Sequence, residues 1–131
     1  MRRRISTAAA AAAAAAMAAT VLAPATAEAG ERDVREEGRC SQYGRYDLKL
    51  SPQNGRIEVE IEVDTNRRGE RYRVRLFHDG RRVRNGVFTT RGISGSFTVR
   101  EVQDDRRGTD RFRLRAVRVG GGNRCGGSAT F

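Results

Sequence analysis

Two stretches of the sequence place an arginine at every second position, and they offer the clearest chemistry in the chain. Residues 70–77 and 110–117 contribute Arg71, Arg73, Arg75, Arg111, Arg113 and Arg115. A guanidinium group donates paired hydrogen bonds to phosphate, sulfate or carboxylate groups, so a row of them on one surface attracts polyanions. These six residues are the candidate binding site. Arg81, Arg82 and Arg84 stand at its edge if the two stretches are neighbours in one sheet.

Glutamates also alternate, at Glu58, Glu60 and Glu62, and they suggest a competing interpretation. If residues 56–64 paired with 70–77 as a hairpin, Glu62 would face Arg71 and Glu60 would face Arg73. Such pairs would neutralise one another and contribute roughly a few tenths of a kcal/mol each. Nucleic-acid readers usually interleave exposed aromatic residues with the charge, whereas the aromatic residues here are expected on the apolar face. The residues alone leave the two pairings open.

No catalytic constellation accompanies these charges. His78 is the only histidine and lies beside the Asp79-Gly80 turn, where a solvated side chain is expected. No serine lies in a nucleophile elbow, and β-patterning explains the alternating glutamates better than a glycosidase pair does. The sequence therefore predicts a non-enzymatic protein with no catalytic residue, no metal and no cofactor.

Period-two alternation also governs the apolar residues, and it predicts the strands that must position the arginines. One face of each strand is expected on a core and the other in water. Further short runs at 46–50, 87–90, 97–102 and 125–131 are separated by turn signals, and no stretch after the first 29 residues shows a helical period. The pattern predicts an all-β sandwich or barrel of about seven strands. The inward rows are Ile57, Val59, Ile61 and Val63, then Tyr72, Val74 and Leu76.

Asp79-Gly80 is expected to form a two-residue hairpin turn of the primed type, which both residue types favour. A tight turn at this point would place Leu76 opposite Val83, and both are apolar. The agreement between register and pattern favours the hairpin.

The first 29 residues have the composition of a secretory signal peptide. Arg2, Arg3 and Arg4 precede an alanine-rich apolar run, and small residues around Ala27 offer cleavage sites. Residues 1–29 are therefore predicted to be removed, which leaves a secreted protein with no stable membrane insertion. Residues 30–39 are polar and lack periodicity, so we expect a flexible lead-in. Residues 40–131 are expected to form one domain.

Cys40 and Cys125 are the two cysteines of the chain, and in a secreted protein they are predicted to form one disulfide. Removing the signal takes away three arginines and one glutamate, so the net charge changes from +10 to +8. Only Lys49 among the 26 basic residues is a lysine. GC-rich coding would give the same preference, so the use of arginine is poor evidence of phosphate recognition by itself.

The stretch Gly108-Thr-Asp-Arg-Phe-Arg-Leu-Arg-Ala116 resembles the F strand of an immunoglobulin-type domain. Residues 70–77 then match the C strand, 95–102 the E strand and 125–131 the G strand. The buried cysteine pair of that fold is absent, with Ile61 and Leu114 in its place, and the chain has no tryptophan. The resemblance implies an immunoglobulin-like antiparallel β-sandwich in which 70–77 and 110–117 are neighbours, so the six arginines would share one outer face.

The whole chain is also similar to small secreted proteins of actinobacteria, with an alanine-rich signal, one cysteine pair and a C-terminal SATF-type strand. No activity is known for those proteins. We therefore expect a secreted, monomeric or weakly associating protein with a binding or structural role. Its expected partner is a polyanion outside the cell, such as teichoic acid, extracellular DNA, an acidic polysaccharide or the cell wall.

Three alternatives come from other classes. A small-ligand carrier, as among the immunoglobulin-like chromoprotein apoproteins of actinobacteria, would need a cleft lined by apolar groups. A secreted protease inhibitor would need a protruding ordered loop, for which residues 120–123 beside Cys125 are a faint match. A small hydrolase would need a cleft with convergent carboxylates.

Overall fold

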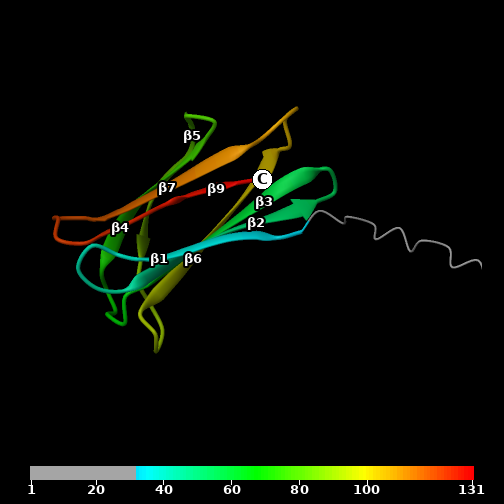
Figure 1. The fold of residues 1–131 in the computed structure, drawn as a ribbon. Coiled ribbons are helices and arrows are strands. Elements are labelled where there is room, and N and C mark those ends of the chain that lie inside the picture. Colours follow the sequence, from blue (N-terminus) through cyan, green and yellow to red (C-terminus); the bar gives the residue numbers. More distant parts are fainter. Residues whose placement is uncertain (1–31) are drawn as a thin grey trace, which may run out of the picture.

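The computed structural model describes residues 32–131, which form nine strands in two antiparallel sheets without a helix (Figure 1). The predicted signal peptide, residues 1–29, lies outside the described residues. The sheets pack as the two layers of a sandwich, so the all-β sandwich predicted from the alternation is confirmed. The described part of the chain includes no helix long and apolar enough to cross a membrane.

The first layer has the strand order β1-β2-β3-β6. Its strands are β1 (Val34–Arg39), β2 (Arg45–Gln53), β3 (Arg56–Asp64) and β6 (Ser96–Asp104). The second layer has the order β5-β4-β7-β8, and β9 also pairs with β7. Its strands are β4 (Arg71–His78), β5 (Arg81–Thr89), β7 (Arg111–Arg118), β8 (Arg124–Cys125) and β9 (Ser128–Thr130).

Strand β1 corrects the expectation of a flexible lead-in over residues 30–39. It pairs along its length with β2, from Val34 opposite Leu50 to Arg39 opposite Arg45. The inward side of β1 carries only one large apolar residue, Val34, so its alternation is hard to recognise in the sequence. Gly38 lies against the ring of Tyr46, where a Cβ atom would come within 2.6 Å of the ring. The glycine therefore lets the tyrosine pack under the edge strand.

The predicted hairpin at Asp79-Gly80 is present, and both residues have positive φ, 48° and 82°. Its register differs from the expectation, because Leu76 lies opposite Arg84 and not opposite Val83. A bulge between Leu76 and Phe77 shifts the pairing by one residue. The extra residue lets Val83 pack against the core while Arg84 Nη1 reaches Glu101 Oε2 of β6, 3.3 Å away. Strand β5 is the outer strand of its layer.

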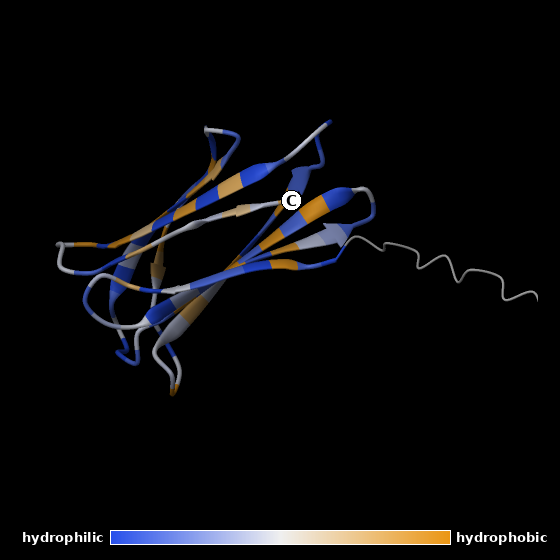
Figure 2. Cartoon of the chain, in the orientation of Figure 1, coloured by the Kyte–Doolittle hydropathy of each residue, from blue (hydrophilic) through white to orange (hydrophobic). Residues whose placement is uncertain are grey.

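The inward rows of both layers form one hydrophobic core, and the alternating bands of hydropathy along β3 and β7 show how each strand contributes one face (Figure 2). The predicted rows of β3 and β4 are confirmed, because all seven side chains are fully buried. Cys40, just after β1, is bonded to Cys125 of β8, so the predicted disulfide is confirmed and joins the two layers. These inward rows fix which side chains must point to solvent on the opposite faces.

Candidate functional site

The two arginine-bearing strands are neighbours. Strand β4 pairs with β7, whereas β3 pairs with β2 and β6, so the competing hairpin between 56–64 and 70–77 is wrong. Glu60 lies opposite Arg100 on the first layer, far from the partner that the hairpin would give it, Arg73. The six candidate residues therefore share the outer face of the second layer, because their strands direct the intervening residues into the core.

The register arranges these six side chains as a line and not as a block. Arg75 directly faces Arg115, but Arg73 faces Val117 and Arg113 faces Phe77. Arg71 lies one step beyond Arg73 on β4, and Arg111 lies one step beyond Arg113 on β7. The charges thus run down β4, cross to β7 at the Arg75–Arg115 pair and continue along β7. We name this set the arginine line, in the order Arg71, Arg73, Arg75, Arg115, Arg113 and Arg111.

The outer face also includes two arginines beside the line. Arg124 of β8 lies opposite Val117, and Arg82 of β5 lies opposite Phe77. Sequence reasoning missed Arg124, because β8 is only two residues long and shows no alternation. Of the three arginines expected at the edge, Arg81 lies opposite buried His78 and Arg84 pairs with Glu101 of the other layer. Only Arg82 therefore belongs to the face.

Two of the line's guanidinium groups are held by neighbouring side chains. Arg113 lies over the ring of Phe77, with its Cζ atom 4.4 Å from the ring centre. Arg73 Nη1 donates a hydrogen bond to Asn85 Oδ1 at 3.1 Å. The expectation that all aromatic residues lie on the apolar face is wrong for Phe77, which follows inward-facing Leu76 and must point outward. A planar cation stacked on a ring loses less conformational entropy when it binds an anion.

Acidic residues are segregated between the two layers. The second layer has three arginines in β4, three in β5, four in β7 and one in β8, and its strands contain no Asp or Glu. The first layer has two acidic residues in β1, one in β2, four in β3 and two in β6. Its outer face is paired, for example through Arg100 Nε and Glu60 Oε2 at 2.8 Å. Among residues 32–131, none of the arginine line forms an ion pair.

A buried polar network closes the end of the sandwich beside Arg71. Arg118 Nε lies 2.9 Å from Glu70 Oε2, and the Tyr43 hydroxyl donates to the same oxygen at 2.5 Å. Asn123 Nδ2 donates to the Tyr72 hydroxyl at 3.0 Å. Burial raises the pKa of Tyr72 to about 12. Glu70 is buried and paired, so its carboxylate faces the inside of the sandwich instead of the arginine line.

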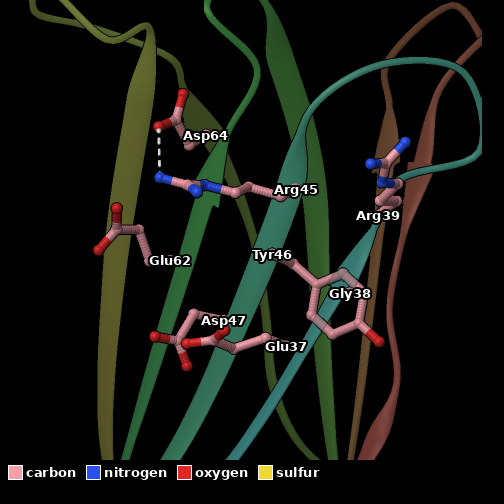
Figure 3. A pocket seen from close by; sticks show the side chains of 8 residues that line it. All are labelled: Glu37, Gly38, Arg39, Arg45, Tyr46, Asp47, Glu62 and Asp64. Atoms are coloured by element: carbon pink, nitrogen blue, oxygen red, sulfur yellow. Dashed lines mark ion pairs between the residues drawn. The ribbon is translucent and has the colours of Figure 1, made fainter.

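A hollow of about 350 Å³ lies over β1, β2 and β3 on the first layer (Figure 3). Its eight lining residues include Tyr46, two arginines and four carboxylates, and Figure 3 shows Asp64 beside Arg45, with Arg39 apart on the other side of Tyr46. Asp64 lies 4.0 Å from Arg45, and Asp47 pairs with Arg35. Glu37 also lies near Arg35, so three of the four carboxylates have an arginine partner. The hollow therefore fits neither an apolar carrier cleft nor a pair of free catalytic acids.

His78 is fully buried, so the expectation of a solvated turn histidine is wrong. Its ring stacks on Phe112 with the centres 4.3 Å apart, and Nε2 lies 2.5 Å from Asp110 Oδ1. The other ring nitrogen, Nδ1, lies 3.4 Å from Gln103 Oε1. Alternation contained the signal, because His78 continues the inward row of Tyr72, Val74 and Leu76. The pair anchors the loop between β6 and β7 to the core.

The same histidine is close to a second carboxylate. His78, Asp79 and Asp110 offer three ligand atoms within 4.8 Å of one another, which is the spacing of a metal site. Asp110 already accepts the Arg106 backbone N–H at 3.2 Å, and Arg106 Nη1 lies 3.8 Å from Asp79 Oδ2. The Arg106 guanidinium group therefore lies beside Asp79, while the backbone N–H of the same residue is donated to Asp110. The arrangement is explained as a structural ion-pair network.

Comparisons of the chain with known protein families, with curated proteins and with solved structures found no match. The function is therefore inferred from the chemistry of the two outer faces.

Proposed function

We propose that the protein is a secreted, non-enzymatic module that binds extracellular polyanions through the arginine line. The observation that carries this proposal is the segregation of charge between the layers. GC-rich coding explains arginine in place of lysine, but it does not explain why the nine acidic strand residues all lie in one layer. A surface with paired charges was accessible to this sequence, since the first layer has one.

The uncompensated face has an energetic cost. Two unit charges about 7 Å apart in water repel each other by roughly 0.6 kcal/mol before salt screens them. Replacing any outward arginine by glutamate would turn repulsion into attraction. A polyanion removes the same repulsion on binding, so its affinity includes the relief of a strain that the free protein carries. Neighbouring arginines on one face thereby support a binding role over a purely structural one.

We also infer that the sandwich is immunoglobulin-like. The strand order supports this inference. One layer contains β2-β3-β6 and the other β5-β4-β7-β9, which matches the order A-B-E and C′-C-F-G of the immunoglobulin fold. Strand β1 is then an additional edge strand, and the disulfide joins the layers at their ends in place of the usual buried pair. An experimentally determined strand order that differs from this one would overturn the inference.

Heparin chromatography with a salt gradient tests the polyanion proposal. The test variant is Arg75→Gln with Arg115→Gln, a directly opposed arginine pair on the second layer. The matched control is Arg56→Gln with Arg100→Gln, two outward arginines of the first layer. Both variants lose the same net charge, and melting temperatures check that both remain folded.

The test variant should elute at clearly lower salt than the control variant, because only its arginines belong to the line. Binding of this kind should also weaken steeply as salt rises, since released counterions drive it. Equal elution of the two variants would mean that net charge alone governs retention. The proposed face would then be abandoned.

A second candidate function, inhibition of a secreted protease, draws on one loop. Ile93 is 94% exposed at the tip of the loop between β5 and β6, and it stands on a turn closed by Gly95 N–H and Gly92 O at 3.3 Å. This ordered, protruding loop has the exposure that the inhibitor alternative requires. The chain reverses within four residues, however, and a protease cleft binds extended backbone. Inhibition of a secreted serine protease that is lost in Ile93→Asp would support this function, and no inhibition would exclude it for that enzyme.

A further inference from the structure

We infer that the ligand of the arginine line is a single chain of three-carbon polyol units joined by phosphodiester bonds, bound along the line and recognised by its backbone. This inference rests on the proposed polyanion binding and specifies its ligand. It follows from the spacing of the charges, the length of the line and the side chains beside it.

The spacing of the line is set by the strands. Outward residues on one strand are two residues apart, which is six backbone bonds and about 6.8 Å. From Arg71 to Arg111 the line makes four such steps, so it is about 27 Å long. It shifts sideways once, by about 4.8 Å, where it crosses from β4 to β7. The result is one narrow track of positive charge.

A phosphodiester chain of a three-carbon polyol has the same repeat. Its path from one phosphorus to the next, P–O–C–C–C–O–P, also contains six bonds, so the extended chain advances by about 7 Å per charge, twice the advance of a peptide unit. Inorganic polyphosphate has only two bonds per phosphate and places its charges much closer together. Duplex DNA carries one charge per about 1.7 Å of a thick rod. Only the single chain with a six-bond repeat can place successive phosphates on successive arginines.

The side chains beside the line favour a polyol over a nucleotide. Within the strands of the second layer, Phe77 is the only aromatic residue on the outer face, and Arg113 covers its ring. Single-stranded nucleic acids gain much of their affinity from bases stacked on exposed rings. Val87 and Val117 flank Arg73 on either side, and they can contact the CH₂ groups of a polyol.

Several arginines are prepared for phosphate. Arg73 and Arg113 are held by Asn85 and Phe77, so less side-chain entropy is lost on binding. Arg75 and Arg115 face each other across the strands and can bracket one phosphate between them. A guanidinium fork matches two phosphate oxygens, and this match gives the line more than its net charge.

The experiment measures dissociation constants of fluorescent oligo(glycerol phosphate) chains of three, six, nine and twelve units. Affinity should rise steeply between three and six units and then increase only slightly, because four steps of about 6.8 Å hold five phosphates. The six-unit chain should show a slope of log K against log salt of about −3.5, since single strands give about −0.7 for each of five neutralised phosphates.

Arg111→Gln tests the end of the line. This substitution should weaken the binding of the six-unit chain about ten-fold, which is the effect of losing one charged hydrogen-bonding partner. The three-unit chain can move to the other arginines and should weaken less than about two-fold. The control is Arg45→Gln on the first layer, which should leave both chains nearly unchanged. If Arg111→Gln and Arg45→Gln have equal effects, the track is refuted.

Three further ligands separate the possible outcomes. Single-stranded DNA with the same number of phosphates also has six bonds per repeat but has no exposed ring on this face on which to stack its bases, so it should bind no more tightly than the polyol, whereas equally charged inorganic polyphosphate and duplex DNA should bind more weakly. A preference for DNA above about ten-fold would overturn the polyol assignment. Binding of all four in proportion to charge would overturn the track and leave the proposed polyanion binding intact. No binding to any of them or to heparin would overturn both.

Discussion

Removing the disulfide should cost a large part of the stability of this small domain. The bond joins residues that are 85 positions apart. In the chain-entropy account, opening a loop of that size lowers the free energy of unfolding by about 4.5 kcal/mol at 25 °C. Domains of this size are stable by roughly 5–15 kcal/mol in all. The double variant Cys40→Ala with Cys125→Ala should therefore be folded at 25 °C. It should be only marginally stable if the unaltered protein has a free energy of unfolding near the lower end of this range.

The structure indicates that this loss acts through the unfolded chain. Around the bond, Ser41 N–H donates to Arg124 O at 2.7 Å, and Arg124 N–H donates to Ser41 Oγ at 2.9 Å. These hydrogen bonds hold the native geometry without the disulfide. Both cysteines are buried, with exposed fractions of 8% and 3%. Alanine is therefore a better replacement than serine, which would bury an unpaired hydroxyl group. The unfolded chain, in contrast, becomes larger when the long loop opens.

Urea unfolding followed by circular dichroism gives both the free energy of unfolding and the m-value, which reports the surface exposed on unfolding. The double variant should lose about 4.5 kcal/mol, and its m-value should rise because the unfolded chain exposes more surface. The control is Ser41→Ala, which keeps the disulfide but removes one hydrogen bond, and it should lose only about 1 kcal/mol. A loss below about 1 kcal/mol in the double variant, or an unchanged m-value, would refute the explanation through chain entropy.

Three further predictions concern the core. Ile61→Asp should lose several kcal/mol or fail to fold, since it buries an unpaired carboxylate, while Glu60→Ala should change the melting temperature little; similar melting temperatures would mean that the faces of β3 are misassigned. Gly38→Ala should lower the free energy of unfolding by about 1–3 kcal/mol, because the added Cβ meets the Tyr46 ring at 2.6 Å. In a Tyr46→Ala background, Gly38→Ala should cause no further loss of stability, as a double-mutant cycle would measure. Burial raises the pKa of Tyr72 to about 12 from the 10.0 of an unfolded chain, so its contribution to stability is complete below pH 10 and lost as the pH rises through 12. Unfolding free energies at pH 9 and pH 12 should differ less in Tyr72→Phe than in the unaltered protein, and an equal difference would contradict the assignment.

The faces of the long strands could be predicted from sequence because burial repeats with the period of the strand. The stretches 57–63 and 72–76 alternate without interruption, and every apolar residue in them is buried as predicted. The same rule, applied one step further, places His78 inside and Phe77 outside. The expectations for His78 and Phe77 were wrong because they relied on the position of the turn and on aromatic character instead of the two-residue alternation of the strand.

Other features depend on contacts that no local pattern contains. Strand β1 is fixed by pairing with β2 and by the fit of Tyr46 against Gly38, and neither leaves a period in the sequence. The bulge in β5 accompanies the contact of Arg84 with Glu101 across the layers. The offset that turns six arginines into a line is the register between β4 and β7. That register is set by packing across a connection of more than thirty residues, so sequence reasoning predicted six side-by-side charges and missed their order.

The bulge also affects how the molecule behaves in a crowded solution. Strand β5 ends its layer, so its free N–H and C=O groups could recruit a strand from another molecule and begin a growing aggregate. Its first four residues include Arg81, Arg82 and Arg84, and a docking strand would have to desolvate these charges. The bulge twists the same segment away from the flat shape that such a template needs. The irregularity that shifted the register thus also protects the exposed edge of the sheet from intermolecular β-pairing.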